Sequence, residues 1–260
     1  MKQNNSNAEL FIQLLGTGTI FSDENHSCAS TLLRYRFANI LVDIGPGTFD
    51  KLKQAEVAPE DLNYIFVTHF HPDHISDLVP FLLYYYLRAP DKSEEKIQVW
   101  GPPGLKNFIL KMREAFGDWL DPDKRIFKIR KLVQPTYKFP EFQLSWEKVV
   151  HNEESIGLRF TFDEKVIAFS GDSEYCQALV NLCRNATLAF LECSFPDRNP
   201  KIGHLTPGGV ANIARQAKVK KVVLIHLYPE TFKVDPVRQI KEEFDGTVEI
   251  GKDLQIISLK

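Results

Sequence analysis

The sequence predicts an α/β sandwich of four layers, in which two β-sheets pack face to face and helices cover their outer faces. The expected elements begin with short strands, continue with helices and strands, and return to strands before closing helices, an order that a single doubly wound sheet fits less well. The 260 residues are 43% hydrophobic and 12% aromatic, which is enough for a large core. Because no low-complexity or Pro/Ser-rich linker divides them, we expect one domain over residues 1–260.

The first half of the chain predicts short strands that lead into a histidine-rich segment. Strands are expected at residues 10–15, 31–36 and 39–42, each bounded by polar or turn-forming residues. A glycine-bracketed turn, Asp43-Ile44-Gly45-Pro46-Gly47, then precedes a helix at 48–54. Residues 64–68 form a buried strand, and the apolar positions after residue 74 recur at helical spacing. A strand at 97–100, a Gly-Pro-Pro-Gly turn and a helix at 105–116 follow.

The second half predicts a further group of strands and the closing helices. The pattern is strand-like over 126–167, with a strand at 142–150 and a hairpin of residues 155–162 and 165–169. Helices are expected at 174–184, 207–217 and 236–244, and strands at 187–192, 221–225, 247–250 and 254–258. The helix at 207–217 has a clear start signal, because Thr206 suits the N-cap and Pro207 the first helical position.

The segment Thr68-His69-Phe70-His71-Pro72-Asp73-His74 predicts a metal site, because it places three imidazoles and a carboxylate within six residues after an apolar run. In an extended segment alternate residues point to the same side, so His69 and His71 can bind one ion. Asp73 and His74 face elsewhere, at the start of the following helix. The alternative is a surface histidine cluster or a pH-sensing patch, but a bundle this tight would repel itself when protonated.

Three downstream residues could complete such a site, because each lies at or just past the end of an apolar, strand-like run: His151, Asp172 and His226. One such residue alone is commonly a hydrogen-bonded structural group, but the histidine cluster under-fills two metal positions. His204 differs, since it lies in a loop before a helix N-cap; it suits a mobile acid or base, and the alternative is an exposed loop histidine. We expect His26, in a polar loop, to be surface-exposed, with a position lining a pocket as the alternative.

These residues resemble the metallo-β-lactamase superfamily, through His69-x-His71-x-Asp73-His74 and the downstream residues that follow in order. Within it the chain is most similar to the ribonuclease Z-like branch, and the motifs that favour this branch are Gly16-Thr17-Gly18, Asp43-x-Gly45-x-Gly47 and Gly203-His204-Leu205-Thr206. The resemblance spans about residues 10–230 and is specific for the fold, much less for the reaction. It implies an αββα sandwich of two mixed sheets with helices on the outer faces. It also implies two divalent metal ions per chain, with Zn expected and Mn or Fe as alternatives, and a possible homodimer.

The resemblance further implies a role for each matching residue. The implied metal ligands are His69, His71 and His151 for one ion, Asp73, His74 and His226 for the other, and Asp172 as the bridge between them. Asp73 would also be a candidate general base for the attacking water. Asp43 would orient a ligand histidine from outside the ligand set. His204 would assist proton transfer at the scissile phosphate.

Two features depart from the ribonuclease Z-like branch. Members that process tRNA carry a long arm between the residues that match His151 and Asp172, whereas only a hairpin separates them here. The glycine commonly found three residues after the last histidine of the motif is Asp77 here, and the sequence offers no interpretation of it. The missing arm and the formal net charge of -2 argue against a dedicated tRNA nuclease.

One basic stretch favours an anionic substrate. Residues 124–138 contain six basic side chains and no acidic one: Lys124, Arg125, Lys128, Arg130, Lys131 and Lys138. Phe127 and Tyr137 are interleaved with them. Lys128, Arg130 and Lys131 are the candidate substrate-binding residues. The alternative is a solvated edge strand whose lysines prevent aggregation.

The sequence leaves three classes of function open. The first is a dinuclear metal-dependent phosphodiesterase that acts on a small or cyclic phosphodiester or on an RNA 3′ end, which His204 in its Gly-His-Leu-Thr setting favours. The second is an acyl hydrolase of the lactonase or thioesterase type. The third is a non-catalytic binding protein, and the complete set of seven candidate ligands argues against it.

Composition also limits the setting in which the protein works. The four cysteines include no Cys-x-x-Cys pair, so we expect ordinary buried thiols rather than a zinc knuckle or a redox motif. The polar start of the chain predicts no signal peptide. The longest apolar run, residues 78–87, is too short to span a membrane. We therefore expect a cytoplasmic protein without a membrane partner.

Overall fold

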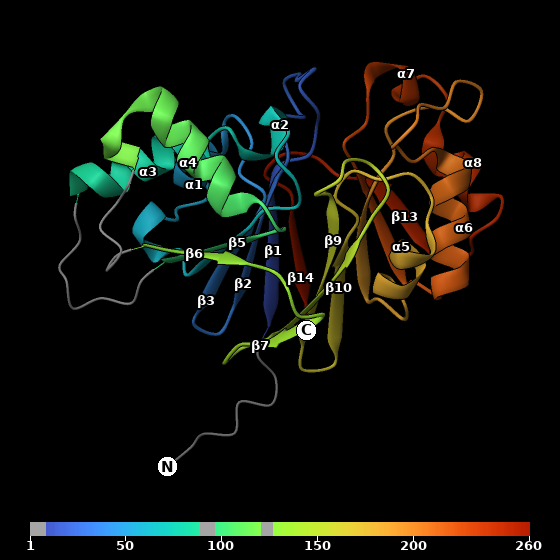
Figure 1. Cartoon of the computed structure of the whole chain (residues 1–260). Helices are drawn as coiled ribbons and strands as arrows, with labels where there is room; N and C mark the ends of the chain where they lie inside the picture. The colour runs from blue at the N-terminus through green and yellow to red at the C-terminus, as the bar shows by residue number, and fades with distance from the viewer. Residues whose placement is uncertain (1–8, 89–96, 121–126) are drawn as a thin grey trace, which may run out of the picture.

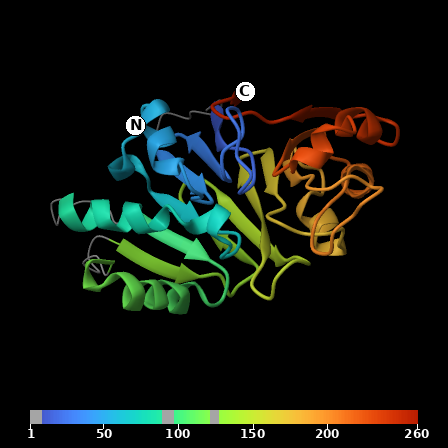
Figure 2. The ribbon, with the colours of Figure 1, turned by 90° about the horizontal axis from the view of Figure 1, so that it is seen from above.

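Two seven-stranded sheets pack face to face in the computed structural model, which describes residues 9–88, 97–120 and 127–260 (Figure 1). Helices cover the outer face of each sheet, so the predicted four-layer sandwich is confirmed (Figure 2). The order of strands is β14-β1-β2-β3-β4-β5-β6 in the first sheet and β13-β12-β11-β10-β9-β8-β7 in the second. Both sheets are mixed, because each contains antiparallel and parallel pairs.

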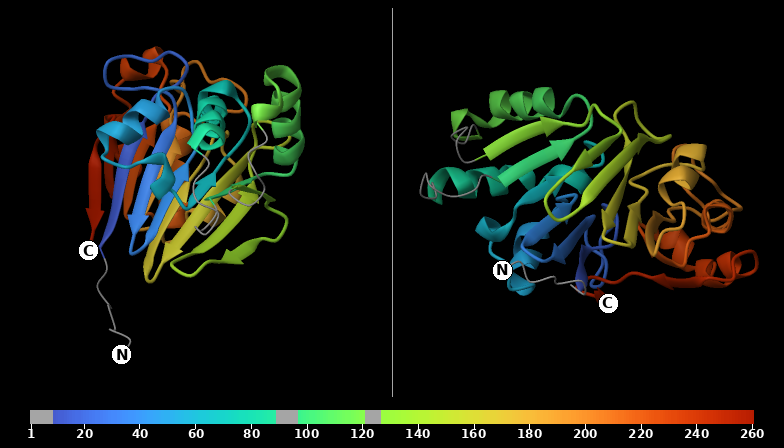
Figure 3. Two further views of the ribbon diagram at one scale, coloured as in Figure 1. Left: turned by 90° about the vertical axis from the view of Figure 1, so that its left-hand side faces the viewer. Right: turned by 90° about the horizontal axis from the view of Figure 1, so that it is seen from below.

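The first sheet combines the beginning of the chain with one strand from near its end. Its strands are β1 (Leu10–Gly16), β2 (Ser30–Tyr35), β3 (Ala38–Val42), β4 (Tyr64–Phe66), β5 (Ile97–Gly101), β6 (Phe127–Lys131) and β14 (Ile256–Leu259). β1 pairs antiparallel with both β2 and β14, so the last strand lies beside the first (Figure 3). From β3 to β6 the neighbouring strands are parallel.

The second sheet is formed by a continuous portion of the chain. Its strands are β7 (Thr136–Lys138), β8 (Gln143–Lys148), β9 (Ile156–Phe162), β10 (Lys165–Phe169), β11 (Leu188–Glu192), β12 (Lys221–Ile225) and β13 (Thr247–Ile250). β7 to β10 are antiparallel neighbours, whereas β10 to β13 are parallel. The parallel strands end at the same edge of their sheet, where polar residues that follow them can meet.

Most of the helices divide between the two outer faces (Figures 1 and 2). Those of the first half are α1 (Thr48–Gln54), α2 (Pro72–Ile75), α3 (Leu78–Arg88) and α4 (Leu105–Phe116), with 3-10 turns at Pro59–Asp61 and Asp118–Leu120. Those of the second half are α5 (Gln177–Leu182), α6 (Pro207–Ala217), α7 (Pro229–Phe232) and α8 (Pro236–Lys241). None of the helices in the described ranges is long and apolar enough to cross a membrane.

Three apolar clusters hold the four layers together. The central cluster lies between the sheets and is rich in aromatic rings, among them the fully buried Phe66, Phe160 and Phe190. A second cluster packs α1, α3 and α4 against the first sheet, and a third packs α5, α6 and α8 against the second. Side chains alternate along a strand, so each strand can supply both the central cluster and an outer one.

Asp77 marks the clearest difference from the predicted elements. The single helix expected after residue 74 is divided there into α2 and α3. The Phe49 backbone N–H donates to the Asp77 carboxylate at 3.0 Å, so this side chain caps α1, whose own N-cap residue is Gly47. Burial raises the pKa of Asp77, although the backbone N–H donors oppose that rise. Asp77 therefore has a structural role where the resembled branch has glycine.

Other differences are confined to element ends and short elements. The helix expected at 174–184 covers only α5, because the Glu174 N–H donates to the Val150 carbonyl (3.0 Å) instead of entering a helix. The helix expected at 236–244 covers only α8. The bounds of β6 and β7 were not predicted, nor was α7. Lys124 and Arg125 lie outside the described residues. All four cysteines are free; three are buried and Cys176 is half-buried.

Candidate metal centre

The candidate residues gather where parallel strands of both sheets end, close to α2 in Figure 1. His69 follows β4 of the first sheet, and α2 carries Asp73 and His74. Asp172 follows β10 and His226 follows β12 of the second sheet. The two sheets therefore bring together residues that are far apart in the sequence. The candidate site lies at the interface between the two sheets.

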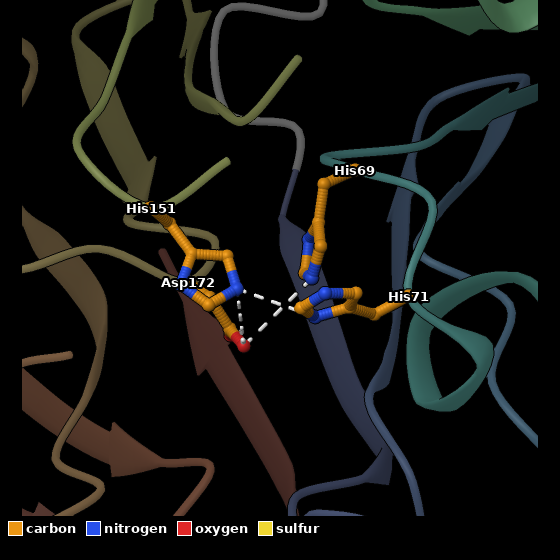
Figure 4. Close-up of side chains that lie close together, drawn as sticks. All are labelled: His69, His71, His151 and Asp172. Carbon is orange, nitrogen blue, oxygen red and sulfur yellow. Dashed lines mark hydrogen bonds and ion pairs between the residues drawn. The ribbon is translucent and has the colours of Figure 1, made fainter. Parts of the chain in front are cut away.

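One group contains His69, His71, His151 and Asp172, whose ligand atoms all lie within 4.8 Å of one another. The Nε2 atom of His151 lies 3.2 Å from Nδ1 of His71 and 3.9 Å from Oδ2 of Asp172. His69 Nε2 lies 3.8 Å from the same carboxylate oxygen. Figure 4 shows the four side chains directed toward one point. This arrangement places three imidazoles and one carboxylate around a position that a single ion can occupy.

A second group contains Asp73, His74 and His226, again with ligand atoms within 4.8 Å. His226 Nε2 lies 3.3 Å from Oδ2 of Asp73. Asp172 contacts this group as well, since its Oδ1 lies 3.3 Å from His74 Nε2 and its Oδ2 lies 3.5 Å from His226 Nε2. Asp172 thus lies between the two groups, where the resemblance places a bridging ligand.

Three buried atoms of these groups test whether a metal fits. His69 Nε2, His74 Nε2 and Asp172 Oδ1 are buried and form no hydrogen bond of good geometry within the described part of the chain, although the last two lie 3.3 Å apart. Buried polar atoms without a partner are costly, so their convergence indicates that something else satisfies them. Imidazole and carboxylate donors without a thiolate suit Zn, Mn or Fe. The donor set therefore fits a divalent metal ion.

Burial and neighbouring charges favour the ligand form of two histidines. Burial, followed by the charge of His74, holds the pKa of His69 well below its usual range. Burial also lowers the pKa of His151. A neutral imidazole keeps a lone pair for a metal. At His74 burial would lower the pKa, but the charges of Asp172 and Asp43 raise it well above the usual range. Those carboxylates would equally stabilise a cation bound at His74 Nε2.

The two buried carboxylates stay ionised because of the histidines around them. Burial alone would raise the pKa of Asp73, but the hydrogen bond with His226 and the charges of His74 and His226 lower it to about 2. Burial would likewise raise the pKa of Asp172, and the charges of His226 and His74 hold it well below its usual range. Both carboxylates can therefore act as anionic ligands at neutral pH.

Asp43 supports the His69–His74 segment from behind, as the resemblance implies. Its carboxylate accepts hydrogen bonds from the Thr68 backbone N–H (2.7 Å) and from the Thr68 hydroxyl (2.9 Å). Its Oδ2 also lies 2.8 Å from His74 Nδ1. Asp43 adopts a left-handed backbone conformation with φ of 58°, which is uncommon for a residue other than glycine. A strained backbone conformation persists where the surrounding contacts stabilise it. Here the hydrogen bonds of the Asp43 carboxylate stabilise it and also orient the His74 ring.

The histidines supplied by the second sheet have backbone and side-chain partners of their own. His226 is also left-handed, with φ of 56°; its N–H donates to the Thr17 carbonyl (2.7 Å), and its Nδ1 lies 3.1 Å from the Ser194 hydroxyl. His151 Nδ1 donates to the Gly203 carbonyl at 2.9 Å. Gly203 has φ of 82°, and a Cβ there would lie 2.7 Å from His151 Nδ1. Position 203 therefore requires glycine.

His204 is paired with a carboxylate that the sequence reasoning missed. Its Nδ1 lies 3.1 Å from Oε1 of Glu192, the fully buried last residue of β11. Only 14% of the His204 side chain is exposed, so the alternative of an exposed loop histidine is wrong. Burial would lower the pKa of His204, but the hydrogen bond and charge of Glu192 raise it. Glu192 has the same context as Asp172 and His226, a polar residue at the end of an apolar strand, and this signal could have found it.

The His204 ring also lies against the metal-centre histidines. Its centroid is 4.8 Å from that of His151, and it stacks on His226 at 6.0 Å with an interplanar angle of 12°. One of its nitrogens lies within 4.8 Å of ligand atoms of Asp172 and His226. Because Glu192 occupies Nδ1, the nitrogen left for exchange with a substrate is Nε2. His204 is therefore held in a fixed orientation, although the sequence suggested a mobile group.

The other predicted residues lie apart from these groups. Only 13% of the His26 side chain is exposed, and its ring bonds Asp23 and packs against Phe232, so the expectation of a surface residue is wrong. Lys128, Arg130 and Lys131 lie on β6, the edge strand of the first sheet, which agrees with the alternative of a solvated edge. Their role in substrate binding stays a prediction.

Comparisons with known proteins agree with this fold. Residues 38–227 match the family model described as the Beta-lactamase superfamily domain. A ribonuclease Z of Borrelia garinii subsp. bavariensis is 25% identical over 306 residues, covering 93% of this chain and 94% of that protein. The metallo-beta-lactamase fold protein YhfI from Bacillus subtilis superposes with a TM-score of 0.85 at 22% identity, covering 96% of this chain and all of that one. The short form of human tRNase Z (ELAC1) superposes with a TM-score of 0.75 at 23% identity, covering 96% and 99%.

Proposed function

The chain belongs to the beta-lactamase superfamily, and from this premise we propose that it is a dinuclear metal-dependent phosphodiesterase that acts on a small or cyclic phosphodiester or on an RNA 3′ end. The family and the likeness to a ribonuclease Z support a hydrolase in general. The finer assignment rests on the side chains at the candidate metal centre, and above all on the pair formed by Glu192 and His204.

The proposed ligand sets follow the two groups of the site. The residues that would hold the ions are His69, His71 and His151 for the first, Asp73, His74 and His226 for the second, and Asp172 for both. When bound, a pair of divalent ions supplies activated water and neutralises charge on the phosphoryl oxygens. Asp73 has an ionised carboxylate next to His226 and can accept a proton from the attacking water. Zn is the proposed metal, with Mn or Fe as alternatives.

The observation that carries the phosphodiesterase proposal is the contact between Glu192 and His204. A leaving alkoxide needs a proton, and a positioned histidine is the usual donor. Glu192 holds Nδ1 of His204 at 3.1 Å, which leaves Nε2 to exchange a proton. One nitrogen of the ring lies within 4.8 Å of ligand atoms of Asp172 and His226, two residues that would hold the ions. The carboxylate also stabilises the protonated ring before the transfer, as in other carboxylate–histidine pairs.

Two observations favour a small or cyclic substrate over a folded RNA. The chain between His151 and Asp172 consists of the β9–β10 hairpin without an arm. The alignment with the Borrelia ribonuclease Z extends over 306 positions although this chain has 260 residues, so that protein carries segments without a counterpart here. This chain therefore offers less surface for holding a large RNA than that protein does.

The proposal is tested with bis(p-nitrophenyl) phosphate and the Zn-loaded or Mn-loaded protein. We expect turnover of this substrate. For a dinucleotide, whose leaving group is an alkoxide, we expect His204→Ala to lower kcat about 100-fold because the leaving group loses its acid. The effect on bis(p-nitrophenyl) phosphate should be smaller, because p-nitrophenolate leaves without a proton. His26→Ala is the matched control, since this histidine lies outside both ligand groups. Parallel assays with a lactone and a thioester distinguish the acyl hydrolase. If those substrates are hydrolysed well and the phosphodiester is not, the proposal is wrong.

A further inference from the structure

Asp253 is a buried carboxylate that belongs to neither ligand group and has no part in the mechanism described so far. It lies in the short segment between β13 of the second sheet and β14 of the first, and only 4% of its side chain is exposed. Its Oδ1 accepts hydrogen bonds from the Thr17 backbone N–H and hydroxyl, both at 2.9 Å. Its Oδ2 accepts hydrogen bonds from the Ser27 backbone N–H and from Lys51 Nζ, also at 2.9 Å, and from the Ser27 hydroxyl. Asp253 therefore joins three segments of the first half of the chain.

Thr17 connects this carboxylate to a candidate metal ligand. Thr17 follows β1, and its carbonyl accepts the His226 backbone N–H at 2.7 Å. Because Thr17 is buried, its own N–H and hydroxyl need partners within the protein, and the Asp253 carboxylate serves both. The position of Thr17, and with it the acceptor of the His226 N–H, is therefore fixed by Asp253.

His226 depends strongly on its backbone contacts. Its φ of 56° is a strained conformation for a residue other than glycine, and such a conformation persists only where surrounding contacts stabilise it. The Ser194 hydroxyl donates to the His226 carbonyl at 2.9 Å, but Ser194 follows β11 and so belongs to the second sheet, like His226 itself. Thr17 belongs to the side of the first sheet, which also supplies Asp73 and His74. The Thr17 contact therefore fixes His226 relative to the other two residues of its ligand group.

A second carboxylate joins the two sheets at their other end and provides a comparison. Asp163 lies in the turn between β9 and β10, at the opposite end of β10 from Asp172. It accepts hydrogen bonds from the Tyr35 hydroxyl at 2.6 Å and from the Arg36 guanidinium at 2.9 Å. Asp163 thus has the same kinds of partner as Asp253, a hydroxyl and a cation, at the end of the sheets that the candidate metal centre does not occupy.

We infer that Asp253 is a positioning residue of the candidate metal centre. Through Thr17 it sets the position of His226 relative to Asp73 and His74, and it thereby raises the affinity for the second ion. The inference rests on the proposed dinuclear centre, whichever reaction that centre catalyses. Residues that orient a ligand from outside the ligand set commonly change metal affinity about 10-fold to 100-fold, and Asp253, which acts through one intervening residue, belongs at the lower end of that range.

Asp253→Asn breaks this link with the least change in volume. An amide has one acceptor oxygen where the carboxylate has two. The Lys51 ammonium and the two Ser27 donors attract that oxygen, so the NH2 group faces the N–H and hydroxyl of Thr17, which lose their acceptor. Lys51→Met is the matched control, because it removes a partner of Asp253 and leaves both carboxylate oxygens in place. Asp163→Asn, the same exchange at the other end of the sheets, is a second control.

Calorimetric titration of the metal-free protein with Zn measures the affinity for each ion. His226→Ala identifies the binding step that involves the second group. We expect Asp253→Asn to weaken that step about tenfold and to leave the other step unchanged, whereas Lys51→Met and Asp163→Asn should change neither. Unchanged affinity in Asp253→Asn, or an equal loss in Asp163→Asn, would overturn the inference and leave the dinuclear centre intact. Fewer than two ions in the wild type would overturn the dinuclear centre itself, and the inference with it.

Amide hydrogen exchange of the metal-free protein, measured by NMR, tests the link without an ion. The His226 amide should exchange about tenfold faster in Asp253→Asn, because its acceptor is no longer fixed, while the amides of β12 at residues 222–224 should change less than about twofold. Equal acceleration at His226 and along β12 would show general destabilisation rather than positioning and would overturn the inference. Faster exchange at His226 with unchanged metal affinity would overturn it as well, since the contact would then be structural alone.

Discussion

The two sides of the candidate metal centre are built in different ways. The side from the first sheet is a continuous segment, residues 69–74, which carries four of the seven candidate ligands. The side from the second sheet consists of single residues that follow separate strands, among them Asp172 after β10 and His226 after β12. The first side depends on local sequence, whereas the second exists only once β10, β11 and β12 have aligned in parallel. Changes on the two sides should therefore have different consequences.

The largest effect is expected at Asp172, where the two sides meet. Asp172→Ala should reduce bound metal below two ions per chain and lower kcat for bis(p-nitrophenyl) phosphate about 1,000-fold, because it removes a contact with both ligand groups. His71→Ala, on the continuous side, should impair only the first group. Elemental analysis together with kinetics measures both. Equal metal loss in the two variants would show that Asp172 has no bridging role.

Removal of metal should lower the free energy of unfolding, because the ions would join ligands from the two sides of the candidate metal centre. Chelation leaves His69 Nε2, His74 Nε2 and Asp172 Oδ1 without partners, and a bound ion at 1,000 times its Kd contributes about 4 kcal/mol to the free energy of unfolding. We expect Tm, measured by calorimetry, to fall by roughly 10 °C and to recover after Zn or Mn is restored. An unchanged Tm with less than one ion per chain would support the non-catalytic binding protein.

Two carboxylates outside the proposed ligand sets, Asp43 and Glu192, allow the two sides of the candidate metal centre to be tested separately. Asp43 supports the continuous side through His74, so Asp43→Asn should weaken metal affinity about 10-fold to 100-fold. Glu192 supports His204, so Glu192→Gln should lower kcat for a dinucleotide, whose alkoxide leaving group needs a proton, by about 10-fold to 100-fold with metal content unchanged. Metal titration and steady-state kinetics on both variants separate these effects. Loss of metal in Glu192→Gln would place His204 among the ligands.

The smallest predicted effect concerns the backbone that supports His151. Gly203→Ala combines a strained positive φ with a Cβ 2.7 Å from His151 Nδ1, so it should cost about 1–3 kcal/mol in the free energy of unfolding and also weaken metal binding. Gly47→Ala is the control, because its φ is 93° but a Cβ there meets nothing within 4 Å. Denaturant unfolding and metal titration compare them. Equal metal affinity in the two variants would contradict the role of the Gly203 contact.

Local signals explain which elements could be predicted from the sequence. α6 has its predicted bounds, and the Thr206 hydroxyl accepts the expected hydrogen bond from the Gly209 N–H (3.4 Å). α1 and α4 also have the predicted bounds, since glycine turns precede both. The helix expected at 174–184 begins only at Gln177, because tertiary contacts hold the chain at its expected start. The Ser173 N–H donates to Glu192 at 2.7 Å, and the Glu174 N–H donates to the Val150 carbonyl at 3.0 Å. Local propensity cannot anticipate such long-range partners.

The residues of the candidate site also divide into those with a local sequence signal and those whose partners are distant in the sequence. His69 to His74 could be identified from their spacing alone, and His151, Asp172 and His226 from their position after apolar strands. Glu192 shares the strand-end position of Asp172 and His226, so its position could have been noticed, but its pairing with His204 depends on a loop that packs over β11 and has no local signal. Asp77 could not be interpreted because its partner, the first turn of α1, is separated from it by a strand.

The pairing of β14 with β1 has a consequence for how the protein is made. Leu10 pairs with Leu259, so all residues between β1 and β14 must be translated before the outer partner of β1 exists. At about 5–20 residues per second this interval lasts roughly 10–50 seconds. The hydrogen-bonding edge of β1 is open during that time and can pair with another nascent chain. The number of residues between β1 and β14 therefore sets how long this edge stays exposed during synthesis.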